Sequence, residues 1–161
     1  MRILIVSDTH RKNDIYVALC ERYKPDMVLH AGDIEGSEYI ISEAARCPVK
    51  MVAGNNDFFS DNPKDIEFNI GKYKIWLTHG HHYYVSMGDE ILVDEARSRG
   101  IDIVIYGHTH KPVVRDDDGI YVINPGSLTY PRQEGRQPSY VVMDIDDAGE
   151  VHFQLKYYLN L

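Results

Sequence analysis

Cysteines are scarce in this chain of 161 residues and form no ligand or redox pattern. Cys20 and Cys47 are the only two, and no C-x-x-C spacing joins them. Both are assigned to predicted helices, as small core or boundary residues. A disulfide framework and thiol redox chemistry are therefore not expected.

Long apolar runs and an excess of positive charge are also missing. No stretch approaches the ~20 consecutive apolar residues of a membrane span, and the chain enters its first predicted strand without a signal-peptide pattern. We therefore expect a cytoplasmic protein with no membrane segment. Lys and Arg total 17 against 25 Asp and Glu, a formal net charge of -8. Because the basic residues are scattered, no stable nucleic-acid binding is expected.

The length predicts a single domain spanning residues 1–161, which needs no disulfide or structural metal to fold. Apolar runs alternate with helical spacings in the first third of the chain, and this pattern predicts a parallel β-α-β-α-β unit. Its expected strands are residues 2–7, 27–31 and 49–53, and its expected helices are residues 14–22 and 37–46.

The rest of the chain is richer in strands. Hairpins are predicted from 65–70 with 73–78, 113–115 with 120–123, and 140–145 with 151–158, and a helix at 89–99 precedes a strand at 101–106. The acidic run 116–118 is interpreted as a solvated turn. About ten strands exceed one comfortable sheet. We therefore predict an α/β fold of two packed mixed β-sheets flanked by helices.

Five predicted strands end at side chains that can bind a metal. Ligands collect beyond the carboxyl ends of parallel strands, so these side chains are expected to converge. They are Asp8 and His10 after strand 2–7, Asp33 after strand 27–31, Asn55, Asn56 and Asp57 after strand 49–53, His79 after strand 73–78, and His108 and His110 after strand 101–106.

The stretch Gly107-His108-Thr109-His110 carries the strongest signal. Two histidines two residues apart on an extended backbone point to the same side, so both rings are expected to face one point. Carboxylate, imidazole and amide ligands without thiolate suit manganese, iron, nickel, cobalt or zinc. The sequence therefore predicts a divalent metal site.

Each residue also has a simpler interpretation. Asp8 and Asp33 are placed to cap the helices that follow them. His79 could be a hydrogen-bonded histidine at a strand end, as residues 81–82 are expected to be, and the pair 55–56 could serve only as a turn. All of these interpretations would have to hold together by accident, which favours the metal site.

The motifs resemble a known family. In order, D-x-H, G-D, G-N-H-[DE], a single central histidine and G-H-x-H are the signature of the calcineurin-like metallophosphoesterases. The chain length resembles the small phosphodiesterases of the YfcE type within that superfamily. The resemblance implies a four-layer α/β sandwich. The matching residues are Asp8-Thr9-His10, Gly32-Asp33, Gly54-Asn55-Asn56-Asp57, His79 and Gly107-His108-Thr109-His110.

The resemblance also implies two divalent ions per molecule, manganese first, with nickel, zinc, iron or cobalt as alternatives. Asp33 would bridge the two ions. The implied mechanism is in-line attack on phosphorus by a hydroxide that bridges the ions. The implied first-site ligands are Asp8, His10, Asp33 and His110, and the implied second-site ligands are Asp33, Asn55, His79 and His108.

One position departs from the family pattern. Asn56 stands where the family usually has a histidine that assists the leaving group, and an amide cannot donate a proton. Diesters are therefore expected to be better substrates than monoesters. Asp57 is expected to orient its loop. With Asp33 and Asn55, these two residues form the predicted catalytic set.

The substrate is expected to be a small phosphodiester. Arg11 and Arg132 are predicted to contact a phosphate oxygen. The aromatic residues 58–59 and 83–84 could wall a substrate pocket or serve burial. The resemblance permits a homodimer or homotetramer. It also leaves an alternative function, since the same fold serves in the retromer complex as a protein-interaction scaffold.

Overall fold

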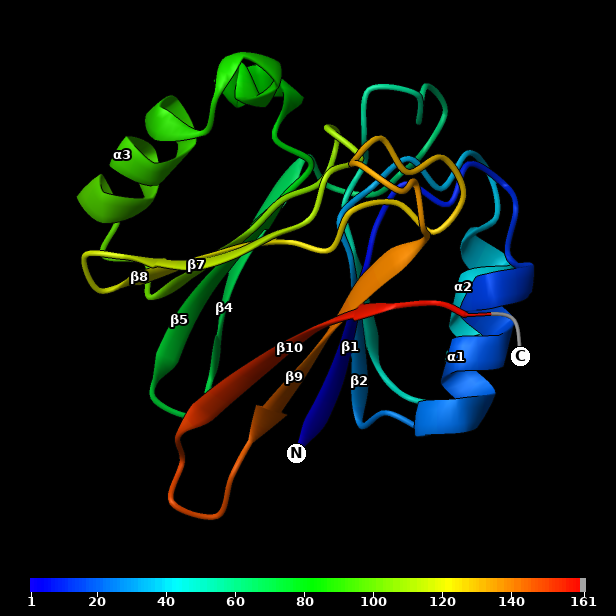
Figure 1. Ribbon diagram of the computed structural model, residues 1–161, viewed down its shortest axis with the longest axis horizontal. Helices are drawn as coiled ribbons and strands as arrows, with labels where there is room; N and C mark the ends of the chain where they lie inside the picture. The colour runs from blue at the N-terminus through cyan, green and yellow to red at the C-terminus, as the bar shows by residue number, and fades with distance from the viewer. Residues whose placement is uncertain (160–161) are drawn as a thin grey trace.

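The computed structural model describes residues 1–159 and contains two five-stranded β-sheets that pack face to face (Figure 1). Helices cover the outer face of each sheet, so the layers run helix, sheet, sheet, helix. This arrangement confirms the predicted α/β fold of two packed mixed sheets with flanking helices. Among the described residues, no helix has the length and apolar character needed to cross a bilayer.

The first sheet joins the start of the chain to its C-terminal strands. In the order β10-β9-β1-β2-β3, its three N-terminal strands are parallel, as predicted, and β9 and β10 add to them in antiparallel pairing. Helices α1 (Asp14–Tyr23) and α2 (Glu38–Ala45) connect the parallel strands and cover one face. The strands are β1 (Arg2–Val6), β2 (Met27–His30), β3 (Val49–Met51), β9 (Ser139–Ile145) and β10 (Val151–Tyr157).

The second sheet has the order β4-β5-β6-β8-β7, with β5, β6 and β8 parallel and both edge strands antiparallel. Helix α3 (Glu90–Ser98) covers its outer face. Two short 3-10 helices, η1 (His81–Tyr83) and η2 (Val85–Met87), were not predicted. The strands are β4 (Asp65–Ile70), β5 (Tyr73–Thr78), β6 (Ile103–Ile105), β7 (Val113–Asp117) and β8 (Ile120–Asn124).

Both faces of the central strands are buried, because each side chain finds apolar partners in the layer that it faces. In β1, Ile3 and Ile5 belong to the core between the two sheets. Leu4 and Val6 instead pack toward α1 and α2. Continuous apolar runs such as this one are typical of parallel strands covered on both faces.

Two local expectations have different outcomes. The solvated turn predicted for the acidic run 116–118 is confirmed only at Asp118, which forms the turn between β7 and β8 with Gly119 at positive φ angles of 49° and 92°. Asp116 and Asp117 belong instead to strand β7. The assignment of Cys47 to a helix was wrong. Arg46 adopts a left-handed φ of 53° and ends α2 before Cys47 is reached.

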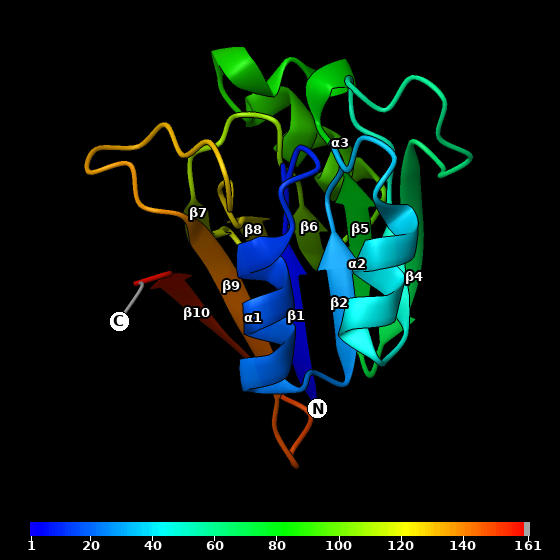
Figure 2. The same ribbon diagram turned by 90° about the vertical axis from the view of Figure 1, so that its right-hand side faces the viewer.

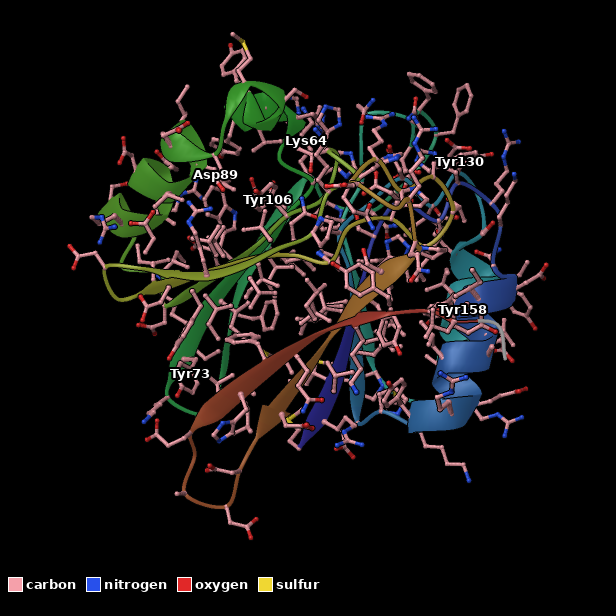
Figure 3. The ribbon with its side chains drawn as sticks, in the orientation of Figure 1. Lys64, Tyr73, Asp89, Tyr106, Tyr130 and Tyr158 are labelled. Carbon is pink, nitrogen blue, oxygen red and sulfur yellow. The ribbon has the colours of Figure 1, made fainter. Side chains whose placement is uncertain are left out.

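Helix α3 is tied to the second sheet by a polar contact. The Tyr106 hydroxyl donates to Asp89 Oδ2 at 3.0 Å just before the helix begins, and Figure 3 shows the two side chains below α3. Arg115 donates to both oxygens of the same carboxylate at 2.7 Å. This bidentate pair fixes the N-terminus of α3 over the sheet.

The carboxyl ends of the parallel strands lie at one end of the molecule. Figure 2 shows α1 and α2 in front of the first sheet, with the loops that follow β1, β2 and β5 gathered above the strands and the N-terminus below. Backbone hydrogen bonds join these loops, from Asp8 N–H to Gly32 O at 3.0 Å and from Gly107 N–H to His79 O at 3.0 Å. The two sheets therefore present their polar strand ends to one region.

Candidate metal centre

One group of predicted ligands forms around Asp8 at the end of β1. His110 Nε2 lies 3.2 Å from Asp8 Oδ1 and also 3.2 Å from His10 Nε2. Two ring nitrogens and a carboxylate oxygen therefore converge on one small volume. Asp8 is fully buried and His110 nearly so, whereas the His10 side chain keeps 13% of its area exposed.

A second group forms around His79 at the end of β5. The amide oxygen of Asn55 lies 2.9 Å from His79 Nε2 and 3.0 Å from His108 Nδ1. The two ring nitrogens are 3.3 Å apart. Because His79 is buried and Asn55 is exposed, this group opens to solvent on the Asn55 side.

Asp33 lies between the two groups. Its Oδ2 is 3.8 Å from His10 Nε2 on one side and 3.5 Å from His79 Nε2 on the other. The structure thus brings all of the predicted ligands together, and Asp8 Oδ1 also lies 3.9 Å from His79 Nε2 across the two groups. Among the described residues, two groups of three His or Asp side chains bring their ligand atoms close enough to hold a metal ion. One contains Asp8, His10 and His110, and the other contains Asp8, Asp33 and His79.

Hydrogen bonds at the far ring nitrogens set the tautomers of three histidines. His110 Nδ1 donates to Tyr130 O at 2.7 Å, and His79 Nδ1 donates to Ala31 O at 2.7 Å. His10 Nδ1 donates to Glu35 Oε1 at 2.9 Å. Each ring in its neutral form therefore turns an Nε2 lone pair toward the cluster, the orientation that metal-binding histidines take.

The oxygen Asp8 Oδ1 tests whether these residues fit a metal. It is completely buried and makes no hydrogen bond, whereas Oδ2 accepts from the Ser7 hydroxyl at 2.6 Å and from His108 N–H at 3.1 Å. Leaving a buried carboxylate oxygen without a partner is costly. A cation would satisfy it together with the inward-facing imidazole nitrogens, so the residues fit a divalent ion.

The charges of the cluster shift its titrations. Burial acts to lower the pKa of His79, but its hydrogen bond to Asp33 and the charges of Asp8 and Asp33 raise that pKa to about 9. Burial acts to raise the pKa of Asp33, yet His79 and the donors of Asn56 hold it well below its usual value. The carboxylates therefore stay ionised at neutral pH, ready for a cation.

The backbone of these loops is held in unusual conformations, and one prediction fails here. His108 and His110 have φ angles of 72° and 60°, so the Gly107–His110 stretch is not extended and its two rings turn to different groups. Asp8 and Asp33 also have positive φ, at 55° and 60°. Non-glycine residues in this region cost of order 1–3 kcal/mol each and cluster at functional sites.

Neither aspartate caps a helix. Asn13 precedes α1 and Ser37 precedes α2, so the capping interpretation of Asp8 and Asp33 is wrong. The histidines at 81 and 82 stand beside the cluster in η1, with their ring centroids 4.0 Å apart. They belong to neither candidate metal group of the described residues.

Two glycines allow the close approach of the loops. A Cβ at Gly54 would collide with the carboxylate of Asp33, and a Cβ at Gly107 would collide with Ser7 Oγ and lie 2.7 Å from Asp8 Oδ2. Any side chain at these positions would push a predicted ligand out of place.

Asn56 and Asp57 hold the loop that carries Asp33. Asn56 donates from its backbone N–H to Asp33 Oδ1 at 2.9 Å and from Nδ2 to Asp33 Oδ2 at 3.0 Å. The Asp57 carboxylate accepts four backbone N–H groups, from Asp33, Ile34, Glu35 and Gly54, at 2.6–3.0 Å. Both side chains therefore position Asp33.

The two predicted arginines lie in separate hollows beside the cluster. Arg11, exposed and 3.3 Å from Glu35 Oε2, lines a cavity of about 460 Å³ with Phe58 and Phe59. Arg132 lines a cavity of about 540 Å³ on the His10 and His110 side, close to Tyr130, whose loop appears at the upper right of Figure 3.

The aromatic residues at 58–59 line the first of these hollows, whereas those at 83–84 line neither. Tyr83 packs edge-on against Trp76 with ring centroids 5.0 Å apart, so it serves burial. Tyr84 is exposed but lies outside both hollows.

Sequence reasoning missed several supporting residues. Glu35 orients His10, and buried His30 accepts from Gly32 N–H at 3.1 Å and contacts the Thr9 hydroxyl at 3.1 Å. Ser127, in the loop after β8, donates to the backbone oxygen of Asp8 at 2.8 Å. An acidic residue two positions after Asp33 was the only signal for Glu35. The Pro-Gly pair at residues 125–126 indicated a turn before Ser127 but not the role of its hydroxyl, and no local pattern indicated His30.

Comparison with known proteins assigns the family. Residues 1–148 match the model of the calcineurin-like phosphoesterase superfamily domain. A protein of Mycoplasma pneumoniae named a probable metallophosphoesterase is 34% identical over 150 residues, which cover 91% of each chain. A phosphodiesterase of Methanocaldococcus jannaschii is 32% identical over 145 residues, covering 78% of this chain and 83% of that protein.

Solved structures agree with this assignment. A predicted phosphoesterase from Streptococcus pneumoniae superposes with a TM-score of 0.81 at 31% identity, covering 99% of this chain and 94% of that chain. Vps29 of Entamoeba histolytica superposes with a TM-score of 0.79 at 27% identity, covering 99% and 100%. The chain belongs to the calcineurin-like metallophosphoesterase superfamily.

Proposed function

We propose that the protein is a dinuclear metal-dependent phosphodiesterase that hydrolyses small phosphodiesters by in-line attack of water on phosphorus. The observation that carries this proposal is the buried Asp8 Oδ1, which has no hydrogen-bond donor but faces His10 Nε2 and His110 Nε2 at 3.7 and 3.2 Å. Lone pairs directed at one another repel unless a proton or a cation lies between them, and one divalent ion would satisfy all three atoms at once.

Two sets of residues would hold the ions. Bound divalent ions would make water nucleophilic near neutral pH and withdraw charge from the phosphoryl oxygens, and manganese is the first candidate, with nickel, zinc, iron and cobalt as alternatives. Asp33 would serve both ions, because its Oδ2 lies between the groups, 3.8 Å from His10 Nε2 and 3.5 Å from His79 Nε2. Asp8, His10 and His110 complete the first set, and Asn55, His79 and His108 complete the second.

The protein's own groups favour diesters. Asn56 Nδ2 donates a hydrogen bond to Asp33, and an amide has no proton to give to a departing alkoxide. General-acid help is worth roughly 10²–10⁴-fold. A poor leaving group on a monoester dianion would therefore react slowly, whereas a diester carries one charge fewer at the same centre.

Cationic groups beside the centre support an anionic substrate. Arg132 and Arg136 line the hollow next to His10 and His110. Lys12 Nζ lies over the ring of Tyr130, another lining residue, 4.6 Å from the ring centre. These few cations can meet a phosphate oxygen. They do not form the basic tract that would hold a long nucleic-acid strand.

A protein-interaction scaffold is the alternative, because the match to Vps29 covers nearly the whole of both chains. The two functions differ in turnover. We expect the manganese-loaded protein to hydrolyse bis-4-nitrophenyl phosphate, and we expect activity to disappear with a chelator and return with metal. A protein that binds metal but turns over no member of a panel of diesters, cyclic nucleotides and monoesters would favour the scaffold.

A further inference from the structure

The hollow that contains Arg11 adjoins the metal centre and has no role in the proposed chemistry. Its volume is about 460 Å³, and its lining includes Glu35, Asn56, Phe58 and Phe59. Glu35 orients His10, and Asn56 donates twice to Asp33. A group esterified to a phosphate at the centre would therefore have this hollow beside it.

Two of the residues that line the hollow are phenylalanines exposed to solvent. The Phe58 side chain is 79% exposed and that of Phe59 is 100% exposed, among the largest exposures of any apolar side chain in the described residues. A phenylalanine gains strongly from burial, since it can bury 150–250 Å². Their high exposure beside the centre is explained if a bound ligand covers the rings.

The rings are carried by a well-anchored turn. Asp57, the residue before Phe58, accepts four backbone hydrogen bonds from two loops. Ser60 N–H closes the turn onto Asp57 O at 3.4 Å. The backbone that carries the phenyl groups is therefore held close to Asp33.

The charges around the hollow limit what it can accept. Glu35 and Glu38 line it, and the one guanidinium there, on Arg11, is already paired with Glu35 at 3.3 Å. With Asp57, three carboxylates line the hollow, so an additional anionic group would be repelled, and an anionic membrane surface would meet the same repulsion. A flat uncharged ring fits better, because it can stack on phenyl faces and on the guanidinium plane.

We propose that this hollow binds the organic part of the substrate, and that this part is an alcohol carrying a flat, uncharged aromatic ring system. The inference rests on the proposed phosphodiesterase function, since the phosphate of such a diester would sit at the metal centre. Two sources share this chemistry, a nucleoside and a simple aryl alcohol. Stacking on aromatic side chains is the common contribution.

Two matched pairs of diesters test the proposal with the manganese-loaded protein. One pair is the methyl diester of adenosine 5′-phosphate and that of ribose 5-phosphate. The other is benzyl methyl phosphate and cyclohexylmethyl methyl phosphate. We expect kcat/KM to be higher for the aromatic member by at least about fivefold. A preference in both pairs indicates that the hollow accepts any aryl group. A preference in the adenosine pair alone indicates that it selects a nucleoside.

Variants connect the preference to the rings. The double variant Phe58→Leu with Phe59→Leu keeps apolar bulk but removes both rings, and it should reduce the ratio of kcat/KM between the aromatic and non-aromatic diesters to nearly one. The double variant Phe58→Tyr with Phe59→Tyr keeps both rings and should retain the preference. Tyr39→Ala removes another exposed ring, 76% exposed on α2 and outside this hollow, and should leave the preference intact. Equal turnover within both pairs by the native protein, or an unchanged preference in the leucine variant, overturns the inference.

A binding measurement separates this inference from the proposed function. Adenosine added to the protein should shift the NMR ring-proton signals of Phe58 and Phe59, whereas ribose should not. These shifts would support the aromatic site even if no diester were hydrolysed. No shift with adenosine or with benzyl alcohol overturns the site, whatever the activity.

Discussion

At the scale of single residues, the centre gathers carboxylate, amide and imidazole groups around few proton donors, one of which is His79 because its pKa is about 9. Asp8 Oδ1 is buried without a hydrogen bond, and the Nε2 atoms of His10, His79 and His110 face inward because their Nδ1 atoms are engaged elsewhere. Such an arrangement is unfavourable by itself, and cation binding would make it favourable. Part of the stability of the native protein should therefore depend on metal.

Replacing Asp33 by alanine should remove both ions. Its Oδ2 lies 3.8 Å from His10 Nε2 and 3.5 Å from His79 Nε2, so one carboxylate serves both groups. Loss of supporting partners around a metal costs 10–100-fold in affinity or activity, and loss of a bridging ligand should cost at least as much. Elemental analysis after dialysis measures the ions per molecule.

Asp144→Ala, at an exposed ion pair with Arg2, is the matched control and should keep its full metal content. His10→Ala should weaken chiefly the first ion. One tightly held ion in the Asp33→Ala protein would contradict the bridging role.

Replacing Asn56 by histidine should raise monoesterase activity. An imidazole with a pKa near 6.5 can donate the proton that the amide lacks, and general-acid help is worth up to about 10²–10⁴-fold. The gain should be largest for leaving groups of high pKa, nearly absent for nitrophenolate, and should fade above about pH 7 as the ring deprotonates. Plots of log kcat/KM against leaving-group pKa measure it. An unchanged slope in a variant with intact metal content would show that position 56 does not handle the departing oxygen.

Motif reading reached the inward-facing residues and the supporting Asp57, but it missed the other supports. A pattern such as Asp8-Thr9-His10 indicates chemistry because those residue types sit at a strand end. Glu35 escaped because its role depends on the fold of the β2–α2 loop, where its own φ is 57°. The left-handed backbone of His108 and His110 also escaped, since tertiary contacts impose it on residues that prefer extended conformations.

At the scale of elements, the strand ends converge only where glycine permits backbones to touch. Gly107 packs against Ser7 and Asp8, joining β6 of the second sheet to β1 of the first. Gly107→Ala should displace Asp8, lower metal affinity by about tenfold or more, and reduce the free energy of unfolding by about 1–3 kcal/mol from overpacking. Metal titration and urea unfolding measure the two effects.

Gly71→Ala is the matched control, because the space around it is open although its φ is 56°. It should lower stability by about 1 kcal/mol without changing metal affinity. Equal metal affinity in the Gly107 variant and the native protein would show that the close approach does not position Asp8.

The alternation of strands and helices predicted β1, β2 and β3 as a parallel unit, because crossover connections leave local periodic patterns. The placement of β9 against β1 could not be predicted in this way. Arg2 Nε donates to Asp144 Oδ1 at 2.9 Å across 142 residues of sequence, and such pairing has no local signal. Local patterns therefore predicted the hairpins, but not which sheet each hairpin joins.

At the scale of the whole molecule, the metal-free protein should be most stable near pH 6.5. His79 has a folded pKa of about 9, above its ordinary 6.5, so its contribution is present below pH 6.5 and is lost as pH rises toward 9. Burial lowers the pKa of His30 to about 4, so its contribution is present above pH 6.5 and is lost as pH falls toward 4.

Urea unfolding of the chelated protein between pH 6.5 and 9 measures the upper limb, which should amount to about 3 kcal/mol. His79→Gln should flatten it, and His152→Gln, at an exposed histidine, should not. A limb unchanged in His79→Gln would contradict the assignment.

The two-sheet architecture was predictable because the number of strands exceeded one sheet, whereas the single-domain organisation remains a prediction. The convergence of ligands from both sheets depends on how the sheets are aligned. That alignment follows from side-chain packing in the central core, which includes Ile5, Leu77 and Ile105. No local pattern encodes it.

Metal titration followed by diester hydrolysis tests the central claim most directly. The chelated protein is loaded with increasing manganese, bound ions per molecule are counted, and turnover of bis-4-nitrophenyl phosphate is measured in the same samples. We expect turnover to appear as occupancy approaches two ions per molecule and to be lost in Asp33→Ala. Full turnover with one ion per molecule, or no turnover at two, would contradict a dinuclear phosphodiesterase.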